Sequence, residues 1–137
     1  MQINEGWLSD ARRVASPNAN QRPQNEISLV VLHSISLPPG CFGGKAIEQL
    51  FTNTLDVSRD AFYREIAHLH VSAHLLIERS GAITQYVDFD ARAWHAGQSE
   101  YCGRPRCNDF SIGIEIEGAD DQPFTLAQYD TAASLVA

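Results

Sequence analysis

The sequence predicts a single α/β domain, and three observations support this. An almost uninterrupted apolar run rich in β-branched residues, Ile27–Ser34, is typical of a strand inside a sheet. A second segment, Ser111–Glu117, alternates apolar and other residues with the period of a strand. Other stretches have the apolar spacing and capping residues of helices. Strands interspersed with helices indicate an α/β fold around a central sheet.

Length and composition fit one domain that spans residues 1–137, with 44% hydrophobic residues. The formal net charge of -7 argues against binding to a nucleic-acid backbone. The first residues lack the basic start and apolar run of a signal peptide, and Leu29–Leu32 is far too short to cross a bilayer. Three cysteines, an odd number, argue against a disulfide framework. We expect a cytoplasmic protein with no nucleic-acid or membrane partner.

The first strand should be central. The 26 residues before it are rich in Asn, Gln, Arg and Pro without a sustained apolar period, which indicates an ordered or semi-ordered arm that Trp7 could pin to the core. Because Ile27–Ser34 is apolar on both faces, we expect it in the middle of the sheet, covered on both sides. His33 then lies at the carboxyl end of a central strand.

Two short helices are expected next. The glycine-rich loop before Lys45–Phe51 is not a phosphate-binding loop, because that motif would need glycine at Pro39 and a hydroxyl residue at Ala46. A second helix follows Asp60, a plausible N-cap, and should pack on the sheet. Its apolar stripe consists of Phe62, Ile66 and Leu69.

A β-hairpin and one more strand complete the sheet. The hairpin joins Ala73–Glu78 to Ile83–Val87 through a turn in which Gly81 supplies a positive φ. In Ser111–Glu117, the isoleucines occupy one face, and Gly113, Glu115 and Glu117 occupy the other. Two carboxylates therefore share the face away from the core.

The last helix has a clear predicted start. Thr125 and Gln128 form a capping box, and Phe124 and Tyr129 have the spacing of a hydrophobic staple. Its expected apolar stripe is Leu126, Tyr129, Ala133 and Val136. Because this stripe still runs at Ala137, without a C-cap glycine, a basic last turn or a proline, we expect the domain to be truncated there.

Several histidines are candidates for metal binding. The carboxyl end of a strand is where α/β folds place ligand-binding groups, which favours His33. His70 and His74 share a face in either a strand or a helix, which fits a metal pair. No Glu follows His70 as a metalloprotease helix requires, so surface or core histidines are the preferred interpretation.

Other polar residues have two interpretations each. Trp94 and His95 fit a packed Trp beside an exposed His, or a rim that faces a sugar or peptide. Arg104 and Arg106 could bind a carboxylate in bidentate fashion, or lie in a solvated loop. Glu115, between isoleucines, could be partly covered, with a raised pKa that suits proton transfer, or it could be an edge-strand charge.

The cysteines offer a weaker alternative site. Cys102 and Cys107 have the widest common spacing of a zinc half-site, and Cys41 could add a third sulfur. No second closely spaced pair completes a zinc ribbon. Free cysteines that act as small hydrophobic residues are therefore preferred over a structural zinc site.

Four segments together resemble a known enzyme family: Val30–Gly40, Val71–Ile77, Arg92–Gly97 and Cys107–Glu115. In this order they are similar to the cytoplasmic 1,6-anhydro-N-acetylmuramoyl-L-alanine amidases of Gram-negative bacteria, within the N-acetylmuramoyl-L-alanine amidase type 2 family. The similarity runs from Gly6-Trp7 to the last helix. Phage lysozyme-type amidases and peptidoglycan recognition proteins resemble the chain more distantly.

The resemblance implies a mixed β-sheet flanked by helices, with one zinc ion in a cleft on the sheet. It implies His33 as a zinc ligand and Glu115 as the catalytic acid/base. The implied reaction is hydrolysis of the amide between the lactyl group of anhydro-muramic acid and L-Ala of the stem peptide, during cell-wall recycling. The implied contacts with this anhydro-muropeptide are Ser34, His70, Ala73, His74, Trp94, His95, Arg106 and Asn108.

The chain also departs from the family pattern. Ser34 stands where close relatives have Asn, and His70 where many have Arg, so part of the peptide-carboxylate contact is unmatched. The family's other zinc ligands, a His and an Asp, and an oxyanion-stabilising Lys lie beyond Ala137. We therefore expect the 137 residues alone to bind zinc weakly and hydrolyse little. A catalytically inactive module that binds peptidoglycan fragments is the alternative function, and the oligomeric state is not predicted.

Overall fold

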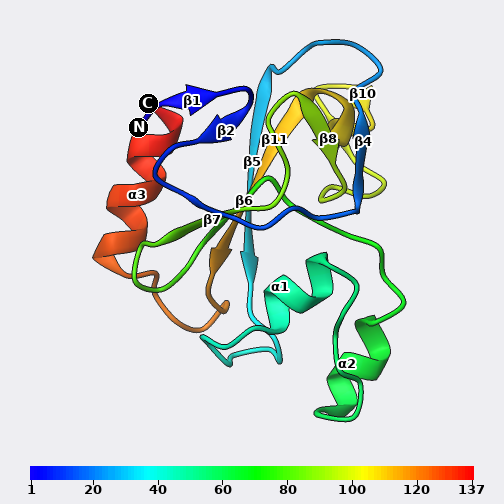
Figure 1. Ribbon diagram of the computed structural model, residues 1–137, viewed down its shortest axis with the longest axis vertical. Coiled ribbons are helices and arrows are strands. Elements are labelled where there is room, and N and C mark those ends of the chain that lie inside the picture. The colour runs from blue at the N-terminus through cyan, green and yellow to red at the C-terminus, as the bar shows by residue number, and fades with distance from the viewer.

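A computed structural model describes residues 1–137 and contains a five-stranded mixed sheet (Figure 1). Its strand order is β3 (Arg12–Arg13), β7 (Ile83–Gln85), β6 (Leu75–Ile77), β11 (Ser111–Glu117) and β5 (Leu29–Ile35). β11 runs parallel to both of its neighbours, and β3 runs parallel to β7. The pair β6 and β7 is the antiparallel hairpin predicted around Gly81, whose φ is 85°. The predicted mixed α/β fold is confirmed.

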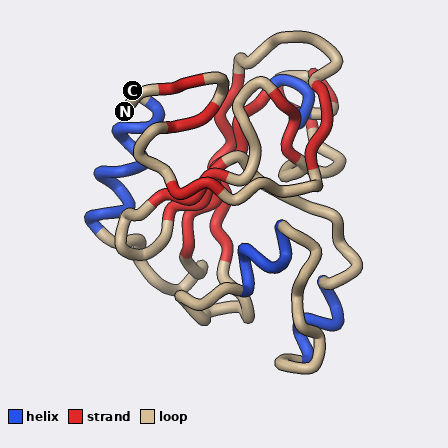
Figure 2. The backbone as a smooth tube through the Cα atoms, viewed as in Figure 1, coloured by secondary structure: helices blue, strands red, loops and turns tan.

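Smaller elements surround this sheet. Three two-stranded sheets pair β1 (Ile3–Asn4) with β2 (Trp7–Leu8), β4 (Ala19–Gln21) with β8 (Ala91–Ala93), and β9 (Glu100–Tyr101) with β10 (Arg104–Pro105). The helices are α1 (Ala46–Phe51), α2 (Ala61–Ile66), the 3₁₀ turn η1 (Cys107–Phe110) and α3 (Leu126–Val136). Figure 2 shows the strands gathered at the centre with the helices at the periphery. Every helix is too short, or not apolar enough, to span a membrane.

Two apolar clusters cover the two faces of the sheet. One contains Leu76 with residues of α1, and Phe62, Tyr63 and Ile66 of α2 pack at its margin. The other contains Leu75, Ile77 and the three isoleucines of β11, with Ala132 and Leu135 of α3 against them. Adjacent residues of β6 therefore enter different clusters, as the two-residue period of a strand requires. α1 and α3 lie on opposite sides of the sheet (Figure 1).

The positions of the two long strands correct the sequence prediction. β5 lies at one edge of the described sheet and alternates in burial, with Val30 and Leu32 exposed. β11 lies between β5 and β6, and all seven of its residues are buried. The continuous apolar run was therefore wrongly placed in the middle of the sheet, and the alternating strand is the one that lies inside the sheet with a neighbour on each side. Glu115 and Glu117 do face away from the isoleucines, but the face that they share is also covered.

The N-terminal arm is ordered, but Leu8 rather than Trp7 anchors it to the core. Leu8 is the buried apolar residue of the β1–β2 hairpin, whereas Trp7 is half-buried. The Arg13 guanidinium carbon lies 3.6 Å from the centroid of the Trp7 ring, a cation–π contact.

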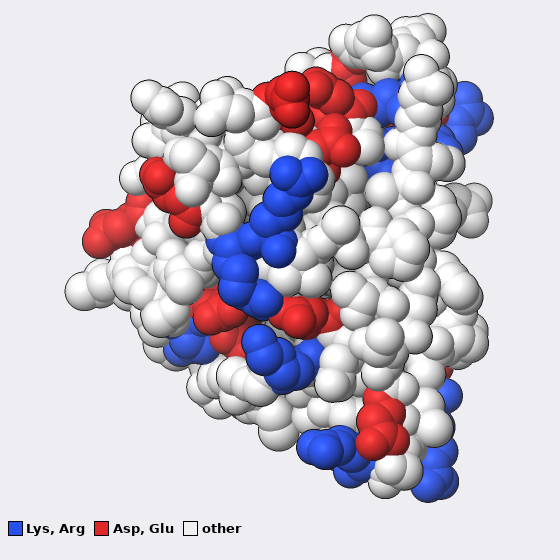
Figure 3. Space-filling view, in the orientation of Figure 1, with Lys and Arg blue, Asp and Glu red and all other residues white.

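The face in Figure 3 carries acidic and basic side chains next to one another rather than one extended basic patch.

The start of α3 is as predicted, but its buried face is not. Thr125 and Gln128 form the capping box, and the Phe124 and Tyr129 rings lie 6.2 Å apart. The expected core stripe points outward, since Leu126 is 82% exposed and Tyr129 and Val136 are also exposed. Gln128 is buried instead, because its Nε2 donates to the carbonyls of Ile77 and Glu117 at the strand ends. These two bonds fix the rotation of the helix.

α2 also differs from its prediction in part. Asp60 is its N-cap, with Oδ1 accepting from the Phe62 backbone N–H at 2.8 Å. None of its residues is fully buried, and the helix lies beside α1 rather than on the centre of the sheet (Figure 1). The predicted N-cap is therefore confirmed. Phe62 and Ile66 of the predicted stripe pack at the margin of the cluster on the sheet, whereas Leu69 lies beyond the end of the helix and is exposed.

Candidate active site

Glu115 and His33 face the same side of the sheet. Parallel pairing of β11 with β5 sets Glu115 opposite His33, and Gly113 opposite Val31. Because side chains alternate along a strand, Ser111, Gly113 and Glu115 share this face with His33. Ser34, the next residue of β5, is exposed and belongs to the opposite face.

Glu115 is a buried carboxyl group with an unused oxygen. The residue is 9% exposed, and its Oε2 is buried without a hydrogen-bond partner. Burial raises the pKa of Glu115 to about 7, because the charged form loses its hydration. A carboxyl group with a pKa near 7 exchanges protons readily at neutral pH, as a general acid/base must. The predicted partial burial and raised pKa are both found.

His95 makes contact with His33 and with β11. Its Nδ1 lies 2.9 Å from His33 Nε2, and its Nε2 lies 3.1 Å from Ser111 Oγ. The ring also lies against Gly113, where an added Cβ would come within 2.3 Å of His95 Cγ. Burial lowers the pKa of both imidazoles, that of His95 to about 3, so both are neutral near pH 7.

His74 is a fully buried cross-link rather than a ligand facing solvent. Its Nδ1 accepts from the Gly113 backbone N–H at 3.0 Å, so in the neutral ring the proton is on Nε2. That Nε2 lies 3.1 Å from the Ala91 carbonyl, to which it can donate. Burial lowers the pKa of His74 to about 4. His70 is exposed, so the structure does not bring the sequence pair His70 and His74 together in one site.

The other residues expected to contact substrate lie in varied surroundings. Ala73 is fully buried in the cluster that contains α1. Trp94 is half-buried, and its Nε1 donates to Asn20 Oδ1 at 3.3 Å. Asn108 is half-buried, with Oδ1 accepting from the backbone N–H groups of His95 and Ala96. Their contacts with substrate stay predictions.

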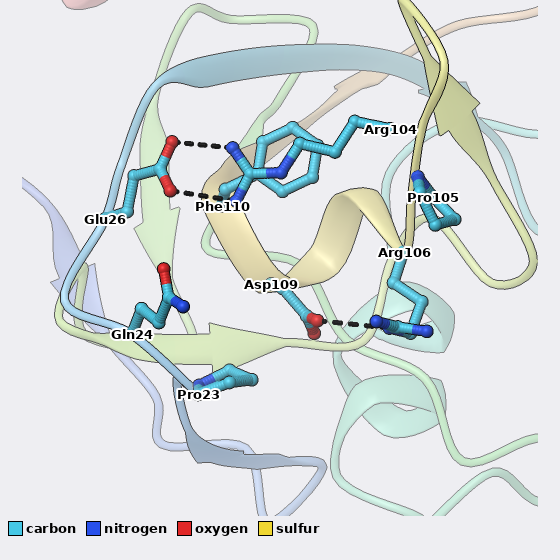
Figure 4. Close-up of a pocket in the computed structure, with 8 residues that line it drawn as sticks. All are labelled: Pro23, Gln24, Glu26, Arg104, Pro105, Arg106, Asp109 and Phe110. Carbon is cyan, nitrogen blue, oxygen red and sulfur yellow. Dashed lines mark hydrogen bonds and ion pairs between the residues drawn. The ribbon is translucent and has the colours of Figure 1, made fainter.

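The two predicted carboxylate-binding arginines differ in availability. Figure 4 shows them on the wall of a cavity of about 190 Å³. Arg104 already holds a carboxylate, because its two terminal nitrogens donate to the oxygens of Glu26 at 2.7 and 2.8 Å. Arg104 also lies 3.8 Å from the centroid of the Phe110 ring. Arg106 has a side chain that is 76% exposed and only a long ion pair, 3.5 Å, with Asp109. Arg106 is therefore the guanidinium free to meet a ligand.

A second cavity, of about 420 Å³, opens beside the histidines. It is lined by the edge of β5, including Val31 and His33, and by His95 and the segment from Ala96 to Cys107. Its walls are mainly apolar, and its polar residues are the two histidines, Ser99 and Glu100, which is the usual composition of a ligand-binding cleft.

The chain does not assemble a complete metal site. No group of three or more His, Cys, Asp or Glu side chains is placed to hold an ion. All three cysteines are free thiols; Cys41 and Cys102 are exposed, whereas Cys107 is buried. His33, with His95 beside it, supplies fewer than the three protein ligands of a catalytic zinc site. The residues present do not fit a zinc ion by themselves.

Comparison with known proteins identifies the family. Residues 23–137 match the family model described as N-acetylmuramoyl-L-alanine amidase. The chain belongs to the N-acetylmuramoyl-L-alanine amidase family. The 1,6-anhydro-N-acetylmuramyl-L-alanine amidase AmpD of Escherichia coli (strain K12) is 58% identical over 136 residues, which are 98% of this chain and 74% of that protein. This amidase is therefore an enzyme that cleaves an amide bond.

Solved structures of amidases share its fold. The crystal structure of a selenomethionine derivative of AmpD has a TM-score of 0.96 and 57% identity, and the match covers 98% of this chain and 76% of that one. The E. coli amidase AmiD in complex with anhydro-N-acetylmuramic acid-L-Ala-D-gamma-Glu-L-Lys has a TM-score of 0.52 and 26% identity, with 88% and 42% covered. The predicted amidase fold is confirmed.

Two residues of this amidase site were not singled out from the sequence. Gly113 had a signal, since a glycine inside a regular strand marks a close approach by another group. Arg22 had none, because it lies in the irregular arm, and its partners, several backbone carbonyls and the His74 ring, are distant in sequence.

Proposed function

We propose that this amidase hydrolyses the amide between the lactyl group of 1,6-anhydro-N-acetylmuramic acid and L-Ala of the stem peptide. The high identity to AmpD, whose name gives this substrate, supports the proposal. The bound anhydro-muropeptide in the AmiD complex supports the same substrate class. We further propose that the reaction takes place in the cytoplasm and serves cell-wall recycling.

The observation that carries the proposal is the unpartnered carboxyl oxygen of Glu115 beside His33. Because its pKa is about 7, roughly half of the Glu115 side chains are ionised at neutral pH. The ionised Oε2 accepts a proton from the water that attacks the amide carbonyl. The same oxygen then returns the proton to the amide nitrogen as the C–N bond breaks, which leaves a lactyl carboxyl group and a free L-Ala amine.

We assign substrate binding to Arg106, Trp94 and His95. Arg106 offers a free guanidinium, which suits bidentate hydrogen bonding to a carboxylate of the stem peptide. Trp94 and His95 are assigned to the rim of the substrate cleft because of the family resemblance. The cavity beside His33 provides apolar walls for the rest of the ligand.

We propose zinc as the metal of the reaction, with His33 as the ligand from these residues. A bound zinc ion would polarise the amide carbonyl and acidify water. Because His33 and His95 do not complete a zinc site, we derive no catalytic step through the metal.

The test is to incubate the intact gene product, with and without added zinc, with anhydro-N-acetylmuramic acid tripeptide. Mass spectrometry then measures free tripeptide, and isothermal calorimetry measures binding to a Glu115→Gln variant. Release of tripeptide that depends on Glu115 supports the proposal. Binding without cleavage would favour the inactive peptidoglycan-binding module instead, and absence of both would exclude the substrate.

A further inference from the structure

Arg22 is a buried cation that is held mainly by backbone carbonyls, and its Nη2 also lies 3.2 Å from His74 Nε2. It follows β4 and is 3% exposed, and it forms no ion pair with a carboxylate. Its guanidinium donates to four carbonyls at 2.8 to 3.3 Å: those of Phe89, Asn108, Asp109 and Ser111. A planar fork of N–H groups can meet several acceptors at once, which an ammonium group cannot do in the same geometry. Arg22 therefore connects the residue after β4 to Phe89, to the η1 turn and to the first residue of β11.

Two of the residues whose carbonyls accept from Arg22, Asn108 and Ser111, also contact His95. Asn108 Oδ1 accepts from the backbone N–H of His95 at 3.1 Å and from that of Ala96 at 2.9 Å. Ser111 Oγ contacts the His95 ring at Nε2, on the opposite side from His33. His95 is thus fixed at its backbone by Asn108 and at its ring by Ser111. The backbone carbonyls of both are hydrogen-bonded to Arg22.

We propose that Arg22 and Asn108 are positioning residues of the active site, which hold His95 against His33 without touching the substrate. For Asn108 this role replaces the substrate contact expected from the sequence, because its Oδ1 is already shared by two backbone N–H groups. The consequence for hydrolysis rests on the proposed function. The fixed position of His95 does not rest on the proposed function, so the position of His95 and the hydrolysis can be tested separately.

Asn108 gives the sharper test. In Asn108→Ala the two amides lose their acceptor, whereas Asn108→Asp keeps an oxygen in the same place. Hydrogen exchange by NMR, in the 137-residue chain without substrate, should show the His95 and Ala96 amides exchanging about tenfold faster in Asn108→Ala, and within threefold of wild type in Asn108→Asp. The amide of Ile114, in the middle of β11, is the internal reference.

Arg22→Lys tests the other half of the proposal. The lysine keeps the charge but cannot bond four carbonyls, so His95 and Ala96 should again exchange at least fivefold faster than in wild type. Arg13→Lys, which changes an arginine far from this cluster, should leave both rates unchanged. If circular dichroism shows that Arg22→Lys does not fold, the Asn108 variants decide.

A matched control separates positioning from general stability. Thr125→Ala removes the N-cap of α3, on the far face of the sheet, and destabilises the fold by an amount similar to the loss of one side-chain hydrogen bond. It should leave the exchange rates of His95 and Ala96 relative to Ile114 unchanged. Equal acceleration of these amides in Thr125→Ala, or no acceleration in Asn108→Ala, would overturn the proposal.

The functional readout uses the intact gene product. With anhydro-N-acetylmuramic acid tripeptide, Asn108→Ala should lower kcat/KM about tenfold, and Asn108→Asp should restore it to within threefold of wild type. Normal exchange with a raised KM in Asn108→Asp would assign Asn108 to the substrate and would overturn its positioning role. If no variant or wild type cleaves, the proposed function fails, whereas the exchange data still decide on His95.

Discussion

The ring of His95 lies directly against the backbone of Gly113, closer than any side chain at residue 113 would allow. A Cβ at this position would lie 2.3 Å from Cγ and 2.5 Å from Cδ2 of the imidazole. The His95 ring therefore packs directly on the backbone of β11, an interior strand of the sheet. The absence of a side chain at Gly113 is what allows His95 to reach both His33 and Ser111.

Gly113→Ala should displace His95. Since the ring must move or the strand must bend, we expect a loss of about 1–3 kcal/mol in the free energy of unfolding, measured by urea denaturation. The activity of the intact gene product should fall at least tenfold. Gly40→Ala is the control, because Gly40 has open space around it and only the strain of a positive φ. An active, fully stable Gly113→Ala protein would show that the His95 contact with Gly113 is not required.

Glu115→Gln should abolish hydrolysis and alter the pH dependence of stability. The folded pKa of about 7 lies above the ordinary value of 4.5, so the folded protein binds more protons between these two pH values. The contribution of Glu115 to the free energy of unfolding is therefore lost as pH rises from 4.5 to 7, and the glutamine variant lacks this loss, so its stability should rise more steeply with pH than that of the wild type. Urea denaturation at several pH values measures the difference. Parallel curves for the two proteins would mean that Glu115 is not buried as described.

His74 should change the free energy of unfolding with pH in the opposite direction to Glu115. Its folded pKa of about 4 lies below the ordinary 6.5, so the unfolded chain binds more protons in this range. Its contribution to stability is present above pH 6.5 and is lost as the pH falls towards 4. In the Glu115→Gln background, where the opposing carboxyl is removed, the free energy of unfolding should therefore decrease on acidification from pH 6.5. NMR titration of the His74 ring gives an independent check, and a pKa near 6.5 would contradict this prediction.

His33 should dominate whatever zinc affinity the 137 residues have. After dialysis against a mild chelator, elemental mass spectrometry should find much less than one zinc per chain, because the donor set is incomplete. His33→Ala should lower residual zinc binding far more than His68→Ala, which changes an exposed histidine. Near-stoichiometric zinc in the wild-type chain would mean that another residue or a second chain completes the site.

Local signals in the sequence were sufficient for several elements. The turn at Gly81, the Asp60 cap and the Thr125–Gln128 capping box each depend on residues a few positions apart, and each is found. The fold class and the partial burial of Glu115 also follow from the strand patterns. These features need no knowledge of what the segment packs against.

Features set by distant partners could not be predicted in this way. The order of β5 and β11 depends on which strands pair with each, and apolar content alone does not encode that order. The rotation of α3 depends on Gln128 reaching two strand ends, so an apolar stripe on the helix pointed to the wrong face. Arg22 contacts segments up to 89 positions away in the chain, and no sequence spacing marks such a residue.

The bonds of Gln128 have one more consequence. Its side-chain amide donates to the carbonyls of Ile77 and Glu117, which are the last residues of the adjacent strands β6 and β11. Without a donor, these strand carbonyls would either pair with another strand or stay buried without a hydrogen bond, which is unfavourable. A single glutamine thus acts on the sheet as a capping residue acts on a helix: it ends the ladder by satisfying its final acceptors.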